Sequence, residues 1–247
     1  MTASRRHLTV LAAWAAALAV TAGPSAAGVV IGINFVGKET LSQSVMAPAE
    51  VAGAVAQANW NNAVSGCGQM AALCETSGAT TGLDVEWRGN TGFLANVENA
   101  PGDKRLMRGH IAPLGTDPIT VTVRGIDSLG PGGWYDLLVY FDGRNGATDW
   151  LGHFTIGAAT REGTDRASTD FAGHFVEDTG SGGNYVRFTH LVGDGFTLSA
   201  EALAGNGGSV AINALQILHA PEPATVGLLG VGLAARLLRR RRGPARR

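Results

Sequence analysis

Cysteine, aromatic residues and charged residues are all scarce in this chain of 247 residues. It has two cysteines, and its aromatic and charged residues amount to 6% and 16% of the total. Two cysteines form one disulfide at most, which excludes a small fold held by a disulfide framework. The sequence also lacks a G-x-S-x-G nucleophile elbow and a phosphate-binding P-loop. The hydrolase classes that depend on those two motifs are therefore not indicated.

A sustained helical period is missing as well, because only the short stretches 51–58 and 70–74 repeat apolar residues at helical spacing. Residues 83–87 and 119–123 instead alternate apolar and polar side chains, as half-buried strands do. Trp134–Phe141 is apolar on both faces and is predicted to be a central strand. Further strands are predicted at 29–35, 151–156, 171–177, 185–188, 196–200 and 210–218.

Glycine, in contrast, is abundant, with 36 residues that fit frequent tight turns between these short strands. About nine short strands joined by such turns predict an all-β fold, a single β-sandwich of the jelly-roll type over residues 28–220.

The first 27 residues have the pattern of a secretory signal peptide. Arg5 and Arg6 precede the apolar run Leu8–Ala22, and small residues follow at 25–27. We expect signal peptidase to cleave after Ala27. A buried core helix is the alternative interpretation of this run.

The last 27 residues combine three features in a fixed order. A Pro-Glu-Pro motif comes first, followed by the run Ala224–Leu238 and then by a cluster of arginines. Fifteen helical residues span about 22 Å, less than the roughly 30 Å of a hydrocarbon core, and Arg236 lies inside the run. The tail therefore predicts a transmembrane helix that anchors the chain in the inner membrane only transiently. The motif consists of Pro221, Glu222 and Pro223, and the cluster, expected on the cytoplasmic side, of Arg239, Arg240, Arg241 and Arg242.

This order of motif, short helix and arginine cluster over residues 221–247 resembles a PEP-CTERM sorting signal. The resemblance implies that an exosortase recognises and removes the tail, and that the host is a Gram-negative bacterium that makes extracellular polysaccharide. It implies a final location at the cell surface or outside the cell. An ordinary tail-anchored protein is the alternative.

Without its two ends the domain is strongly acidic. Residues 28–220 keep 10 Lys and Arg against 19 Asp and Glu, a net charge of about −9, although the whole chain is at −1. Such a domain repels phosphate backbones, so nucleic acid is not expected as a partner.

The two cysteines lie close together in the sequence, as Cys67 and Cys74 of CGQMAALC. Because export leads to an oxidising compartment, we expect a local disulfide between them. A zinc site is the weaker alternative, since the spacing is not C-x-x-C and no matching histidine pair occurs.

Several body segments resemble galactose-binding or malectin-like sandwich domains of exported PEP-CTERM proteins, among them INFVG, AGAVAQANWNN, YDLLVYFDG and VAINALQIL. A sugar-binding role is what this resemblance implies. The cluster ANWNN offers the Trp60 indole for stacking on a sugar ring and the amides of Asn59, Asn61 and Asn62 for its hydroxyls. Extracellular polysaccharide is the expected partner. Alternatively, Trp60 is a core residue and the asparagines form turns.

The loop DGRNGATDW contains three oxygen ligands that suit calcium, Asp142, Asn145 and Asp149. Its order does not match an EF-hand, and Asp-Gly and Asn-Gly are also common turn formers. Calcium is the one candidate cofactor. Asp142 and Asp149 are also an acid–base pair if the protein is a polysaccharide hydrolase, which is the alternative function. The favoured function is a structural or carbohydrate-binding protein without catalytic residues.

Overall fold

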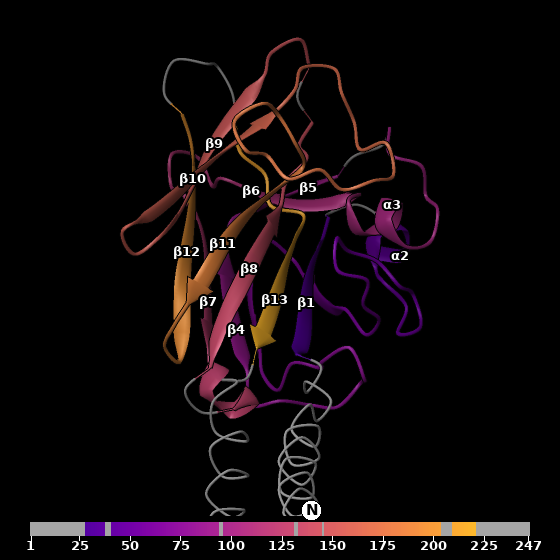
Figure 1. Ribbon diagram of the computed structural model, residues 1–247. Coiled ribbons are helices and arrows are strands. Elements are labelled where there is room, and N and C mark those ends of the chain that lie inside the picture. Colours follow the sequence, from indigo (N-terminus) through magenta and orange to yellow (C-terminus); the bar gives the residue numbers. More distant parts are fainter. Residues whose placement is uncertain are drawn as a thin grey trace, which may run out of the picture. The chain divides into compact units, whose positions relative to one another are not determined.

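Thirteen strands in three sheets form the framework of the domain in the computed structural model (Figure 1), which describes residues 28–37, 41–93, 96–130, 133–144, 146–203 and 209–220. A five-stranded sheet has the order β11-β8-β13-β1-β2, a six-stranded sheet the order β10-β9-β12-β7-β4-β3, and β5 pairs with β6. Among the described strands, β1 and β2 pair in parallel and the other ladders are antiparallel.

The strands are β1 (Val29–Val36), β2 (Asn61–Val64), β3 (Cys67–Met70), β4 (Asp84–Arg88), β5 (Asn90–Phe93), β6 (Gly109–Ala112), β7 (Ile119–Arg124), β8 (Trp134–Tyr140), β9 (Trp150–Ile156), β10 (Ala159–Asp165), β11 (Tyr185–Leu191), β12 (Gly195–Ala202) and β13 (Ala214–Ala220). The helical segments are α2 (Leu41–Ser44), α3 (Asp103–Leu106) and the 3-10 turn η1 (Ile126–Leu129).

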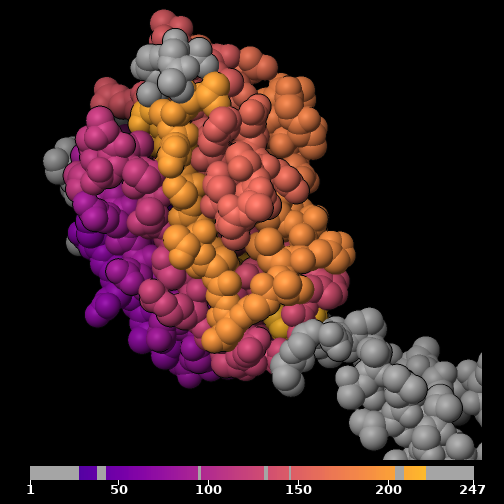
Figure 2. Space-filling model, turned by 90° about the vertical axis from the view of Figure 1, so that its left-hand side faces the viewer, coloured from indigo at the N-terminus to yellow at the C-terminus, as the bar shows by residue number. Residues whose placement is uncertain are grey.

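The main hydrophobic core lies between the two large sheets. It combines buried side chains of the five-stranded sheet, such as Ile33, Leu137 and Ile217, with Val121 and Leu198 of the six-stranded sheet. Figure 2 shows β12 running down the middle of the outer face of the six-stranded sheet, as the strand order requires. The expected all-β class and the sandwich arrangement are confirmed. Whether the sandwich is of the galactose-binding or malectin-like type stays a prediction.

A second, smaller core covers the opposite face of the five-stranded sheet. β8 supplies Leu138 and Tyr140 to it, whereas Leu137 and Val139 of the same strand enter the main core. Because successive side chains of a strand point to opposite faces, β8 is buried on both sides, and the prediction of a central strand is confirmed. The segments around α2 and α3, which lie side by side in Figure 1, close this second core.

One expectation about an individual segment was wrong. Residues 171–177 do not form a strand, because Phe175 packs from a loop onto Tyr140 in the second core and Phe171 packs onto Phe175. Residues 51–58, whose helical spacing was too short to build a helical layer, form turns. The sequence patterns also missed β2, β3, β5, β6 and β10, which are short or mostly exposed.

Gly28–Ala220 forms a compact unit by itself. The expected signal peptide, the motif Pro221, Glu222 and Pro223, the transmembrane run and the arginine cluster all lie outside the described residues. Within the described ranges, the helices are too short to cross a membrane.

Candidate functional site

Trp60 is part of the core and does not offer a stacking surface. Only 4% of the residue is exposed, and its indole NH donates a hydrogen bond to the Gln57 carbonyl at 3.2 Å. The ring meets Tyr140 edge-on, with centroids 6.5 Å apart, and lies directly over β1, where a Cβ on Gly32 would come within 2.4 Å of it. No face of the indole is left for a sugar, so the predicted glycan contact at Trp60 is contradicted.

The side chains of the three asparagines beside Trp60 form hydrogen bonds to other parts of the domain. The Asn61 amide donates to the carbonyls of Gly32 and Cys74 and accepts from the Cys74 NH. Asn62 accepts from the Met46 NH and donates to the Met46 carbonyl. Asn59, with a left-handed φ of 56°, donates to the Thr76 carbonyl. The four residues of the predicted glycan site therefore connect β1, β2 and the loops beside them.

Cys67 and Cys74 are free thiols, which corrects the expected disulfide. β3 begins at Cys67 and runs extended to Met70, a path of roughly 10 Å at about 3.3 Å per residue. Cys74 then bridges to Thr80 rather than turning back toward Cys67. A disulfide requires the two Cα atoms to approach within about 4.4–6.8 Å, which an extended strand between the cysteines opposes.

The two described residues of the calcium site predicted in the loop after β8 are engaged in different interactions, and the site itself stays a prediction. Asp142 is buried, with 3% exposed, whereas Asp149 forms an ion pair with Arg166 at 2.8 Å and accepts the Ala167 NH at 2.7 Å. These two interactions hold the pKa of Asp149 below its ordinary value. Asn145 lies outside the described residues. An acid–base pair of Asp142 and Asp149 also stays a prediction; Asp149 is engaged with Arg166.

The structure instead brings Asp142 together with Asp165, the last residue of β10. Asp142 follows β8 of the five-stranded sheet and Asp165 ends β10 of the six-stranded sheet, so the two sheets place them side by side. Between them, Gly143 donates its NH to Asp165 Oδ2 at 2.8 Å. A Cβ on Gly143 would lie 2.2 Å from the Trp150 ring, so glycine is required at this position. No sequence pattern pointed to this pair, because its two members lie in different sheets.

Both carboxylates line a pocket of about 220 Å³. The other polar side chains around it come mostly from the loop after β10: Arg166, Asp170, His174 and Asn184. Asn184 is held in place because it accepts from the Val176 NH and donates to the His174 carbonyl. His174 itself has an exposed side chain. This pocket is smaller than the roughly 300–1,000 Å³ of typical small-molecule sites.

Asp142 is the unusual group of this pocket. Its Oδ2 accepts the Phe171 NH at 2.8 Å, but among the residues that the structure describes its buried Oδ1 has no hydrogen-bond partner. Burial raises the pKa of Asp142 to about 8, and the nearby charges of Asp165 and Asp170 add to this effect. An acid that is protonated near neutral pH beside a second carboxylate is a feature of binding sites and of acid–base catalysts.

Three comparisons with known proteins bear on the identity of the chain. It is an all-β protein whose C-terminal segment, residues 219–242, matches the PEP-CTERM protein-sorting motif. The match supports an exported protein that an exosortase sorts across the inner membrane to the cell surface or extracellular space. Among proteins with curated descriptions, none matches the chain.

One solved structure is similar to the sandwich at a distance. It is the Bacteroides uniformis beta-glucuronidase 2 covalently bound to cyclophellitol-6-carboxylate aziridine. The likeness covers 65% of this chain and 20% of that enzyme, with 8% identity and a TM-score of 0.34. At this distance it says nothing about substrate or activity.

Proposed function

We propose that this chain is an exosortase-processed protein of the cell surface or extracellular matrix whose β-sandwich binds carbohydrate there. The observation that carries the proposal is the sorting motif at residues 219–242. It begins at the end of β13, the strand that completes the five-stranded sheet. The unit Gly28–Ala220 is therefore what the sorting machinery delivers.

Carbohydrate binding by the sandwich is supported by the pocket of Asp142 and Asp165. Carboxylate and amide groups accept and donate the hydrogen bonds that sugar hydroxyls require. Asp170 is partly exposed and His174 is exposed at the pocket, so both are accessible to a ligand. The site is thus polar rather than aromatic, unlike the stacking site expected at Trp60.

A secreted polysaccharide hydrolase is the second candidate, and one observation favours it. Asp142 and Asp165 share a pocket, and burial has raised the pKa of Asp142 to about 8. A protonated acid beside a second carboxylate is the combination that glycosidases use. Binding and hydrolysis therefore have to be separated by experiment.

Processing is tested by expressing the full chain in a bacterium with an exosortase. We expect the released protein to begin near Gly28 and to lack residues 239–247, because both end signals are removed during export. Intact-mass analysis of the extracellular protein measures this directly. A released protein that retains the arginine cluster would contradict exosortase processing.

Carbohydrate binding is tested with the exported protein on an array of neutral, amino and acidic glycans, with release of reducing ends measured on the same panel. We expect retention on at least one class without release of reducing ends. His174→Ala should weaken that retention about 3- to 10-fold, the worth of one or two hydrogen bonds. His153→Ala is the matched control, since His153 pairs with Glu162 on the outer face of the six-stranded sheet.

The two candidate functions give different results in this experiment. Release of reducing ends that Asp165→Asn abolishes would establish the hydrolase instead. Absence of both retention and release over the whole panel would leave the sandwich with a structural role only.

A further inference from the structure

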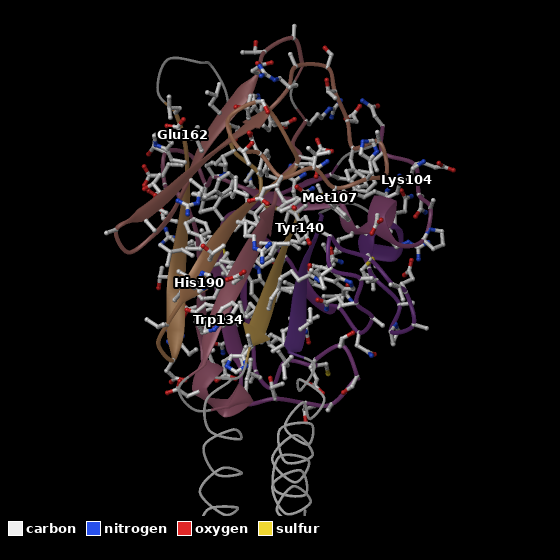
Figure 3. The ribbon with its side chains drawn as sticks, viewed as in Figure 1. Lys104, Met107, Trp134, Tyr140, Glu162 and His190 are labelled. Atoms are coloured by element: carbon white, nitrogen blue, oxygen red, sulfur yellow. The ribbon has the colours of Figure 1, made fainter. Side chains whose placement is uncertain are left out.

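Trp134 and His190 form an aromatic pair on the outer face of the five-stranded sheet. Their rings stack with centroids 4.6 Å apart and planes inclined by 26° (Figure 3). Trp134, the first residue of β8, is partly exposed, whereas Trp60 and Trp87 are buried, and it belongs to neither of the two cores that the described residues form. His190 lies in β11 and is exposed. The pair therefore presents aromatic surface to the solvent.

The backbone of β11 is distorted where it carries His190. The pairing of β11 with β8 changes its register between Phe188 and Leu191, as at a β-bulge, and His190 has a left-handed φ of 56°. Bulges re-aim side chains, and a left-handed conformation is uncommon for residues other than glycine. Such a conformation persists where the surrounding contacts impose it, and it is frequent at binding sites.

Asp136 supplies the contacts that hold this arrangement. It is 3% exposed and lies two residues after Trp134, on the same face of β8. Its Oδ1 accepts the His190 NH at 2.8 Å, and its Oδ2 accepts Nε of Arg187 at 3.0 Å and also Nη2. A buried carboxylate is costly unless it is paired, and both partners of this one lie beside the aromatic pair. Asp136 is therefore a positioning residue for His190 and Arg187.

We propose that Trp134, His190 and Arg187 form a second carbohydrate-binding surface, which contacts a neutral polysaccharide. Aromatic rings pack against the apolar face of a pyranose, and the imidazole and guanidinium groups offer hydrogen bonds to its hydroxyls. The Arg187 side chain is 39% exposed, so it is accessible beside the two rings. Trp and Arg are also among the residues that most often dominate binding surfaces. This inference rests on the carbohydrate-binding function proposed above and names the class of its ligand.

Charge favours a neutral sugar chain over an acidic one. The carboxylate of Asp136 compensates the charge of Arg187. Glu177 adds a negative charge beside Tyr185, which precedes Arg187 on the same face of β11. In addition, the net charge of about −9 on residues 28–220 repels polyanions. An acidic polysaccharide would therefore meet no uncompensated positive charge at this surface.

The surface is separate from the pocket of Asp142. Trp134 begins β8, whereas Asp142 follows its end at Tyr140, and the strand between them spans about 20 Å at roughly 3.3 Å per residue. A single sugar ring therefore contacts one of the two sites. A polysaccharide chain is long enough to contact both, which raises its overall affinity without any new contact.

The test measures how far the exported protein is retarded during native electrophoresis through gels that contain a soluble β-glucan, xylan or galactomannan, with alginate as the acidic polymer. We expect retardation by at least one neutral polysaccharide. Trp134→Ala should raise the dissociation constant about 3- to 10-fold, as the loss of one aromatic contact does. Trp134→Phe, which keeps a ring, should retain most of the affinity.

His190→Asn tests the same surface with little risk to folding, because the side chain is exposed and asparagine tolerates the left-handed backbone. It should weaken retardation as well. His153→Asn is the matched control, since it makes the same exchange at a histidine on the outer face of the six-stranded sheet. It should leave retardation unchanged.

The outcomes distinguish this inference from the proposed function. Retardation that His174→Ala weakens, but Trp134→Ala and His190→Asn do not, would overturn the second surface and leave carbohydrate binding at the pocket. Retardation by alginate alone would overturn the neutral ligand. Absence of retardation in every gel would overturn both the surface and the carbohydrate-binding function. If Trp134→Ala fails to fold by circular dichroism, His190→Asn decides.

Discussion

Replacing Trp60 by alanine is expected to lower the free energy of unfolding by about 3–5 kcal/mol, as for other buried tryptophans. The reason is that the indole fills the space between β1 and Tyr140, where no neighbour is positioned to replace it. The loss of its hydrogen bond to the Gln57 carbonyl adds to the cost. Urea denaturation followed by tryptophan fluorescence or circular dichroism measures the effect.

Trp134→Ala provides the comparison, because it removes the same side chain from a less buried place. Trp134 stacks on the exposed His190, with ring centroids 4.6 Å apart (Figure 3), and contributes to neither core. Trp134→Ala should lower the free energy of unfolding by about 0.5–1.5 kcal/mol, which is what one aromatic pair contributes. If both variants lower the free energy of unfolding by the same small amount, Trp60 is not buried in solution.

Acid is expected to destabilise the domain by about 3 kcal/mol between pH 7 and pH 4 through His110 alone. His110 lies in β6 and is 4% exposed, and no atom of the described part of the chain hydrogen-bonds its Nδ1. Burial lowers its pKa from 6.5 to about 4. In the unfolded chain the imidazole takes up its proton near pH 6.5, whereas in the folded state it stays neutral. The stability that this residue contributes is therefore complete above pH 6.5 and is lost as the pH falls through 6.5 toward 4.

The contribution of His110 is isolated by comparing pH profiles of unfolding free energy for the wild type and His110→Gln. The difference between them should change by about 3 kcal/mol between pH 7 and pH 4, since His219 and the carboxylates contribute to both profiles alike. A His110→Gln profile parallel to that of the wild type would show that His110 titrates normally in the folded state.

The body strands could be located from the sequence where their pattern was long and regular. Val85 and Trp87 in β4 and Val121 and Val123 in β7 alternate with exposed neighbours, and β8 is apolar on both faces because it lies between two cores. Residues 171–177 show why apolar content alone misleads. Phe171 and Phe175 are packed in the second core, yet they reach it from a loop.

The candidate site was only partly visible in the sequence. Asp142 was identified from its loop, but its expected partner Asp149, seven residues further along the chain, is not among the residues that line the pocket. Asp165, the actual neighbour, ends a strand of the other sheet. Similarly, ANWNN has the composition of a sugar-binding cluster, whereas the contacts of Trp60 and Asn61 make it part of the core.

The sequence by itself determined the properties that depend on neighbours along the chain: the alternation that makes strands, the acidic charge of residues 28–220, and the sorting motif at 219–242. Only the tertiary structure decided the burial of Trp60, the separation of Cys67 from Cys74 and the pairing of Asp142 with Asp165. The physical reason is that burial and the pKa of a carboxylate depend on which groups the packing of two sheets brings within a few ångströms. Residues 23 positions apart, as Asp142 and Asp165 are, become neighbours only through that packing.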